Sequence, residues 1–156
     1  MSGDGWGDAR WEGRRRAREA ALRMLYQIEV GHLAPADAAR VHAATGGDEA
    51  LPLDAEAEAF AETLARGAWQ ARTTADGYIA EAARNWRVER LAVVDRLLLR
   101  LAVHELLAHP GTPPRVVIDE AIELARTYSG GEAAKFVNGV LDGVFKRLKE
   151  EGKVVD

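Results

Sequence analysis

The segment VDRLLLRLAVHELL, residues Val94–Leu107, decides the fold, because it has a helical pattern and is apolar around most of its circumference. Its polar exceptions are mainly Asp95 and a stripe of three residues spaced four apart that ends at His104. A helix that is apolar on most sides lies at the centre of a domain and is covered by other helices. The segment therefore predicts a central helix over about Arg90–Ala108.

The chain on both sides of this segment continues in helical periods. Toward the C-terminus, Pro113 and Pro114 suit the start of a helix, Ser129–Gly131 interrupts the pattern, and a last helix follows. Toward the N-terminus, four further helices are expected over about Arg14–Val30, after Pro35, from Asp54 and over Thr74–Trp86. The sequence thus predicts an all-α fold of about seven helices with short connections.

Length and composition favour a single domain in a reducing compartment. The chain has 156 residues and no cysteine, which excludes disulfides and thiolate metal sites. Residues 1–13 are rich in Gly and Asp and are expected to form a flexible tail, with the helical domain over 14–150. No apolar run is long enough for a membrane span or a signal peptide, so a cytoplasmic location is expected.

No arrangement of residues typical of catalysis or metal binding stands out. The four histidines lack metal-ligand spacing, and neither Ser2 nor Ser129 belongs to a triad pattern. The segment SGGEAAK lacks the spacing of a phosphate-binding loop. The adjacent acids Asp119 and Glu120 point apart on a helix and are expected to be solvated. We therefore expect no enzyme activity, no cofactor and no metal.

Positive charge is concentrated at the start of the first helix. Arg10–Arg18 holds five arginines and one acid, although the whole chain has a net charge of −4. Arg14, Arg15, Arg16 and Arg18 span more than one turn and are expected to fan around the axis. Arginine binds phosphate oxygens and stacks on bases, so the asymmetry favours an anionic partner.

The same helix carries two apolar stripes. The core stripe contains Ala17, Ala21, Met24, Leu25 and Ile28. A second stripe of Leu22, Tyr26 and Val30 lies on nearly the opposite side. Either the helix is enclosed within its own fold or the second stripe binds a partner, and the spacing leaves both alternatives open.

Three blocks of the chain resemble the NusB family of bacterial transcription antitermination factors. They are RRRAREAALRMLYQIE (14–29), VDRLLLRLAVHELL (94–107) and VVIDEAIELARTYSGGEAAKFVNGVLD (116–142), in the family's order and spacing. The resemblance implies two packed helical subdomains. It also implies that the protein binds boxA RNA of ribosomal RNA leaders together with the ribosomal protein NusE, and that the pair acts on RNA polymerase.

The resemblance also implies site residues, by position. The RNA-binding residues would be Arg14, Arg15, Arg16, Arg18, Glu132, Lys135 and Phe136. The partner-binding residues would be Leu22, Tyr26, Glu29, Val30 and Asp95. Core packing is the alternative role for Phe136, and a homodimer of the free protein through the second stripe stays open.

The sequence departs from the family pattern at three positions. Asp119 stands where the family usually has Asn, and Ala133 and Ala134 lack side chains that could hydrogen-bond RNA. Base selectivity is therefore left open. Two alternatives to an RNA-binding factor remain: a protein-interaction module without RNA, and a domain like those that precede ribosomal RNA cytosine methyltransferases. The second would need a long C-terminal catalytic domain, whereas this sequence ends at Asp156.

Overall fold

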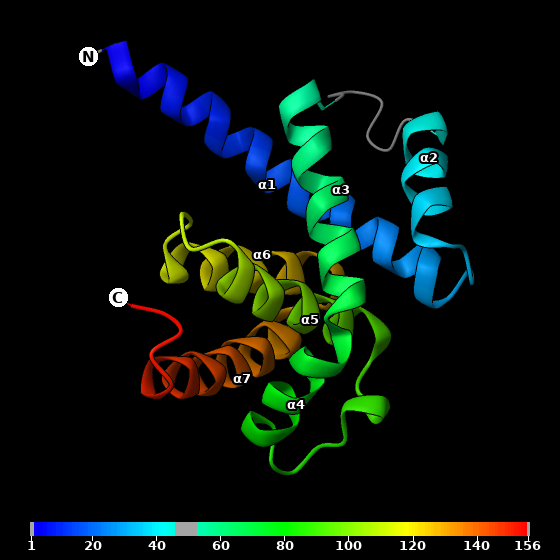
Figure 1. The fold of residues 1–156 in the computed structure, drawn as a ribbon. Coiled ribbons are helices and arrows are strands. Elements are labelled where there is room, and N and C mark those ends of the chain that lie inside the picture. The colour runs from blue at the N-terminus through cyan, green and yellow to red at the C-terminus, as the bar shows by residue number, and fades with distance from the viewer. Residues whose placement is uncertain (1, 46–52, 156) are drawn as a thin grey trace. The chain divides into compact units, whose positions relative to one another are not determined.

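The computed structural model describes residues 2–45 and 53–155, and the side chains of residues 11–43 and 53–155. Within these ranges it contains seven α-helices, one short 3-10 helix and no strand (Figure 1). The elements are α1 (Ser2–Glu29), α2 (Pro35–Thr45), α3 (Ala55–Gln70), α4 (Arg72–Ala82), η1 (Val88–Arg90), α5 (Val93–Ala108), α6 (Pro114–Ser129) and α7 (Gly131–Glu150). The predicted all-α class and the number of helices are confirmed.

The chain divides into two compact units, residues 1–66 and 67–156, with the boundary inside α3. In the first unit α1 packs against α2. The core stripe predicted for the first helix is buried throughout, from Ala17 to Ile28. Asp54 caps α3, since its carboxylate accepts a hydrogen bond of 2.8 Å from the backbone N–H of Ala57.

Helix α1 begins at Ser2, twelve residues before the expected start at Arg14. Gly3, Gly5 and Gly7 each lower the helix preference by about 1 kcal/mol relative to alanine, which is why a tail was expected. Once a helix has nucleated, however, each added residue gains one hydrogen bond at little further cost. Residues 2–13 therefore extend the helix that the downstream apolar stripe establishes.

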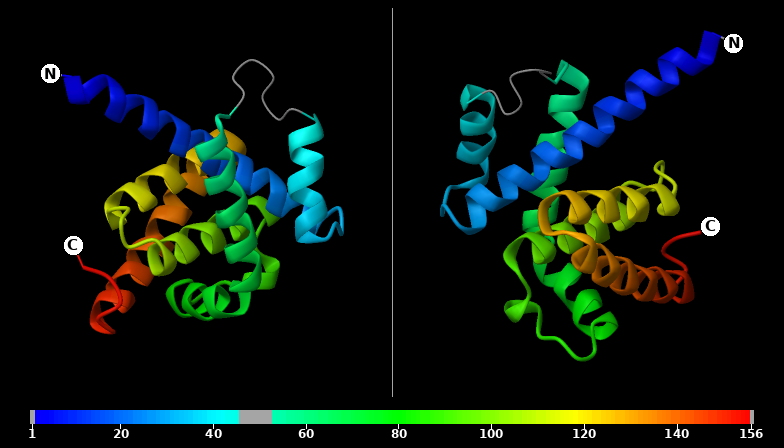
Figure 2. Two further views of the ribbon diagram at one scale, coloured as in Figure 1. Left: turned by 45° about the horizontal axis from the view of Figure 1, so that its top comes forward. Right: turned by 180° about the vertical axis from the view of Figure 1, so that it is seen from behind.

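In the second unit α5 is the central helix, as predicted. It contacts α4, α6 and α7, and α6 and α7 lie side by side (Figures 1 and 2). Its buried residues cover most of its circumference and include Leu97, Leu98, Leu99 and Val103. The acid Glu105 is also buried, and so is Glu120 of α6, which was expected to be solvated. Asp119 is exposed as expected.

The helix boundaries around α5 differ from the prediction. Helix α4 ends at Ala82 and α5 begins at Val93, so residues 83–92 form a turn, η1 and a short extended link. The expected helix ends, Trp86 and Arg90, both lie in this connection. Two buried apolar residues, Val88 and Leu91, hold the connection against the core, which a helical period alone does not reveal.

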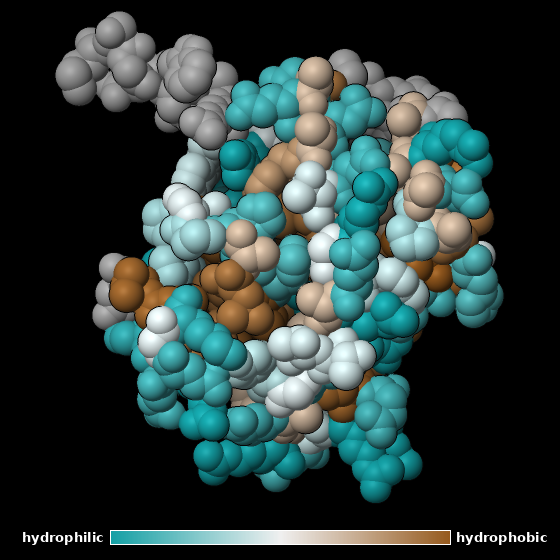
Figure 3. All heavy atoms as spheres, in the orientation of Figure 1, coloured by the Kyte–Doolittle hydropathy of each residue, from teal (hydrophilic) through white to brown (hydrophobic). Residues whose placement is uncertain are grey.

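A single residue joins α6 to α7. Gly130 has φ of 95° and ψ of −180°, a conformation that is essentially restricted to glycine. Its N–H donates to the carbonyls of Ala125 and Arg126, which ends α6, and α7 starts at Gly131. The apolar stripe of α7 from Val137 to Leu148 is buried, and the side of α7 visible in Figure 3 is mostly hydrophilic.

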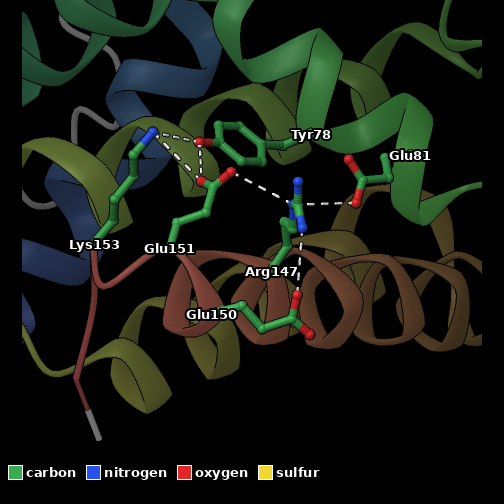
Figure 4. Close-up of polar contacts among 6 residues, drawn as sticks. All are labelled: Tyr78, Glu81, Arg147, Glu150, Glu151 and Lys153. Carbon is green, nitrogen blue, oxygen red and sulfur yellow. Dashed lines mark hydrogen bonds and ion pairs between the residues drawn. The ribbon is translucent and has the colours of Figure 1, made fainter.

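Polar side chains join the end of α7 to α4 (Figure 4). The Tyr78 hydroxyl donates to Glu151 at 2.5 Å and accepts from the Lys153 ammonium group at 2.7 Å. Arg147 lies 3.4 Å from Glu81 of α4 and 3.4 Å from Glu151. The hydrogen bond from Tyr78, ahead of the charge of Lys153, lowers the pKa of Glu151. These exposed contacts fix the last turn of α7 beside α4.

Candidate nucleic-acid interface

The arginines at the start of α1 are arranged around Phe60 of α3. The guanidinium carbon of Arg14 lies 3.8 Å from the centre of the Phe60 ring, and that of Arg18 lies 5.8 Å away. Arg14 and Arg18 share this side because residues four apart occupy one face of a helix. Cation–π contact of this kind holds a guanidinium group in one orientation.

Only part of the predicted arginine fan reaches the surface. Arg18 is 5% exposed, so it has little surface to offer a phosphate. Arg15 is exposed, and Arg14 and Arg16 are partly exposed. Of the four arginines predicted to bind RNA, Arg14, Arg15 and Arg16 have side chains that solvent can reach.

The second apolar stripe of α1 passes from a buried to an exposed position along its length. Leu22 is 3% exposed, whereas Tyr26 and Val30 are each 44% exposed. Residues spaced four apart rotate by about 40° per step, because an α-helix has 3.6 residues per turn. The row that begins at Arg18 therefore starts against the core and ends in solvent. Leu22 belongs to the core, and the accessible part of the stripe is Tyr26 and Val30, next to the partly exposed Glu29.

The start of α7 presents the second set of expected RNA-binding residues. Glu132 and Lys135 are exposed and form an ion pair at 3.9 Å. Phe136 is partly buried, which agrees with its predicted place at the margin of the apolar stripe. Ala134 is 2% exposed, so a longer side chain there would meet the core before it met RNA. Of the two alanine departures, only Ala133 lies near the surface.

Trp86 is a functional candidate that the sequence analysis missed. It is 60% exposed, and its ring lies 6.0 Å from that of Phe136 at an interplanar angle of 73°. Helical periodicity placed Trp86 at the end of a helix, where an aromatic residue needs no explanation. A signal was present nonetheless, since Trp86 stands between Arg84 and Arg87 in a polar turn.

Asp95 occupies the first turn of α5, where the helix dipole favours a negative charge. One of its carboxylate oxygens, Oδ1, is buried and has no hydrogen-bond partner among the described residues. The four expected partner-binding residues of α1 belong to the first unit, whereas Asp95 belongs to the second.

His104 and His109 pack against each other in the second unit. His104 and His109 meet edge to face at 5.8 Å, and a Cβ atom at Gly67 would lie 2.2 Å from His104 Nε2. Burial, followed by the charge of His109, lowers the pKa of His104. No group of three potential ligands that could hold a metal ion occurs among the described residues. None of the helices described is long and apolar enough to cross a membrane.

Comparison with known proteins gives consistent matches over most of the chain. The model of the NusB family matches residues 15–146. The chain is 44% identical over 140 residues to the transcription antitermination protein NusB of Symbiobacterium thermophilum, which covers 87% of this chain and 91% of that protein. It is 43% identical over 132 residues to the protein of the same name from Bacillus velezensis, covering 84% and 94%.

Two solved structures have folds similar to that of this chain. The fold is similar to T. maritima NusB, with a TM-score of 0.73, 38% identity and coverage of 85% of this chain and 90% of that one. It is also similar to a chain in the crystal structure of antitermination factors NusB and NusE in complex with dsRNA, with a TM-score of 0.75, 26% identity and coverage of 87% and 98%. Since the family model and these relatives span most of its length, the chain belongs to the NusB family.

Proposed function

We propose that the protein is a transcription antitermination factor that binds single-stranded boxA RNA of ribosomal RNA leaders together with the ribosomal protein NusE. The pair then acts on RNA polymerase. The observation that carries the proposal is the basic start of α1, where Arg14 is held over Phe60 at 3.8 Å in a chain of net charge −4. Such a cluster has a clear use in binding a polyanion, and a protein-only adaptor has no need of it.

The proposal assigns RNA and the ribosomal protein to two different surfaces. Arg14, Arg15 and Arg16 contact RNA phosphates, and the start of α7 contributes Lys135 and Phe136. Tyr26 and Val30, both half-exposed apolar residues, contact the ribosomal protein. Asp95, which is partly exposed in the first turn of α5, adds an acidic group to the same contact. A solved structure with a similar chain holds antitermination factors NusB and NusE in complex with dsRNA, which supports this choice of partners.

In this proposal the protein is a binding factor without catalytic activity. It acts in the cytoplasm, where bacterial transcription occurs. The antitermination names of its relatives support the first point.

Titration of boxA RNA against salt, with and without NusE, tests the proposal. Each arginine that reaches a phosphate on a single strand contributes about −0.7 to the slope of log affinity against log salt concentration, so Arg14, Arg15 and Arg16 together contribute about −2. Arg15→Gln should reduce the slope by about 0.7. Arg40→Gln is the matched control, because Arg40 is exposed on α2 and paired with Asp37 at 2.6 Å. An affinity that does not depend on salt, or equal affinity for a scrambled RNA with NusE present, contradicts the proposal.

A further inference from the structure

The exposed side chain of Trp86 is the feature of the second unit that the proposed RNA contacts leave unexplained. Trp86 is 60% exposed, more than any other described Trp, Tyr or Phe. A single exposed apolar residue is common on protein surfaces, so the inference depends on what surrounds Trp86.

The backbone holds Trp86 in a fixed place. Its N–H donates to the carbonyl of Ala83 at 2.9 Å, which closes the turn after α4. Ala83 before it and Val88 after it are buried, at 5% and 7% exposed. The turn is thus anchored on both sides, and a ligand that bound the indole ring would not have to order the loop first.

The aromatic contact with Phe136 leaves an indole face open. The two rings meet at 73°, so the edge of one points at the face of the other and the rings do not stack. At most one face of Trp86 is used in such a contact. The other face can take a flat apolar ligand, and Phe136 supports the indole from beside it.

The surroundings of Trp86 are cationic. Arg84, Arg87 and Arg90 are all exposed, and no side-chain ion pair or hydrogen bond joins any of them to another residue in the described ranges. The single acid within this run is Glu89. An aromatic ring among arginines without ion-pair partners fits a ligand that is both flat and anionic. Single-stranded nucleic acid has this combination, because each unpaired base carries a π-face and a phosphate.

We propose that Trp86 stacks on an unpaired base of the bound RNA, and that Arg84 and Arg87 contact the flanking phosphates. The surface extends the one at the start of α7 through Phe136. This inference rests on the proposed RNA-binding function. It adds a base-contacting residue from the turn between α4 and α5.

The test is titration of single-stranded boxA RNA with the wild type, Trp86→Leu and Trp86→Phe, each with and without NusE. Loss of one stacked base predicts about 5- to 150-fold weaker binding for Trp86→Leu. Trp86→Phe should recover most of this loss. Phe145→Leu is the control for the loss of an aromatic side chain elsewhere in the second unit, because Phe145 lies on α7 about 13.5 Å along the helix from Phe136.

Two further measurements separate stacking from other roles. The salt slope should be unchanged in Trp86→Leu and reduced by about 0.7 in Arg87→Gln, because only the arginine contacts phosphate. An RNA series with one base removed at each position in turn should contain a position whose removal weakens the wild type but not Trp86→Leu. That position identifies the stacked base.

The outcomes distinguish this inference from the proposed function. If the wild type does not bind boxA RNA, the proposed function fails and the inference fails with it. If the wild type binds and Trp86→Leu binds equally well, only the inference is overturned. It is also overturned if Trp86→Leu weakens the binding of NusE without weakening that of RNA alone. Should Trp86→Leu fold poorly, quenching of Trp86 fluorescence by RNA in the Trp6→Phe, Trp11→Phe, Trp69→Phe variant decides the question.

Discussion

The side chain of Phe136 lies partly in the core and partly at the surface. It is partly buried, it touches Trp86, and Val137 beside it is fully buried. A fully buried Phe cut to Ala costs about 3–5 kcal/mol of unfolding free energy. We expect Phe136→Ala to lose less than that and to bind boxA RNA about 1–3 kcal/mol more weakly.

Denaturant melts and RNA titrations on the same preparation check both values, with Val140→Ala as the control for a purely buried residue. Wild-type RNA affinity in the folded fraction of Phe136→Ala would remove Phe136 from the RNA surface.

Tyr26 and Leu22 give opposite expectations although they lie four residues apart on α1. Tyr26 is 44% exposed and Leu22 is 3% exposed. Tyr26→Asp should therefore weaken NusE binding while the melting temperature stays close to that of the wild type. Leu22→Asp should unfold the protein, since it buries an unpaired charge.

Circular dichroism melts and a NusE binding assay on both variants measure the difference. A Tyr26→Asp protein that melts like Leu22→Asp would place Tyr26 inside the fold.

For single residues, the sequence indicates which side chains have the chemistry to bind a ligand, but it does not indicate how exposed they are. The arginines of α1 are recognised from charge alone, but the burial of Arg18 depends on tertiary packing, in which its neighbours include Phe60, a residue about forty positions away. Trp86 was missed for a similar reason, because its exposure depends on buried anchors on both sides of the turn. Exposure is a property of tertiary packing, which local periodicity does not contain.

Among the elements, the joint between α6 and α7 is the most constrained. Gly130 has a φ of 95°, whereas Gly131 does not have a positive φ. Gly130→Ala should lower the free energy of unfolding by about 1–3 kcal/mol through backbone strain. Gly131→Ala, the matched control, should leave it unchanged or raise it by up to about 1 kcal/mol.

Neither substitution meets a steric obstacle, because no other heavy atom lies within 4 Å of a Cβ built at either glycine. Equal stabilities of the two variants in a denaturant melt would show that the conformation of Gly130 is not needed.

Element boundaries were predicted where chemistry marks them. Proline marks the starts of α2 and α6, Asp54 marks the start of α3, and the glycine pair separates α6 from α7. The prediction was wrong at the start of α1 and around residues 83–92, and at α4 no side-chain hydrogen bond caps the helix. There the helix limits depend on propagation from a neighbouring stripe or on burial of a connecting segment.

For the whole molecule, two histidines make stability depend on pH. Burial, followed by the charge of Arg23, lowers the pKa of His42, and burial also lowers that of His104. The unfolded chain therefore binds more protons than the folded one once the pH falls below about 6.5, the ordinary histidine value. Stability should be at its full value above this pH and should decline as the pH decreases toward the lowered pKa values.

Melting temperatures at pH 7.5 and 5.5 measure the effect. His42→Gln and His104→Gln should each flatten the pH dependence, and a wild-type melting temperature that rises on acidification would contradict it.

The fold class of the molecule follows from one segment of the sequence. The apolar circumference of the segment from Val94 to Leu107 predicts a central helix, and in the structure α4, α6 and α7 contact α5. The two units of the chain meet within one continuous helix, α3, so no linker composition could have marked that division.

The row of residues from Arg14 to Val30 follows α1 without interruption and ends one residue past it, with the basic group at one end and the apolar group at the other. These ends are about 24 Å apart along the axis. A ligand at one end and a ligand at the other therefore contact the same helix. By thermodynamic reciprocity, any factor by which the ribosomal protein changes the affinity for RNA is also the factor by which RNA changes the affinity for the ribosomal protein. A single coupling constant therefore describes assembly on α1, and its value does not depend on which component binds first.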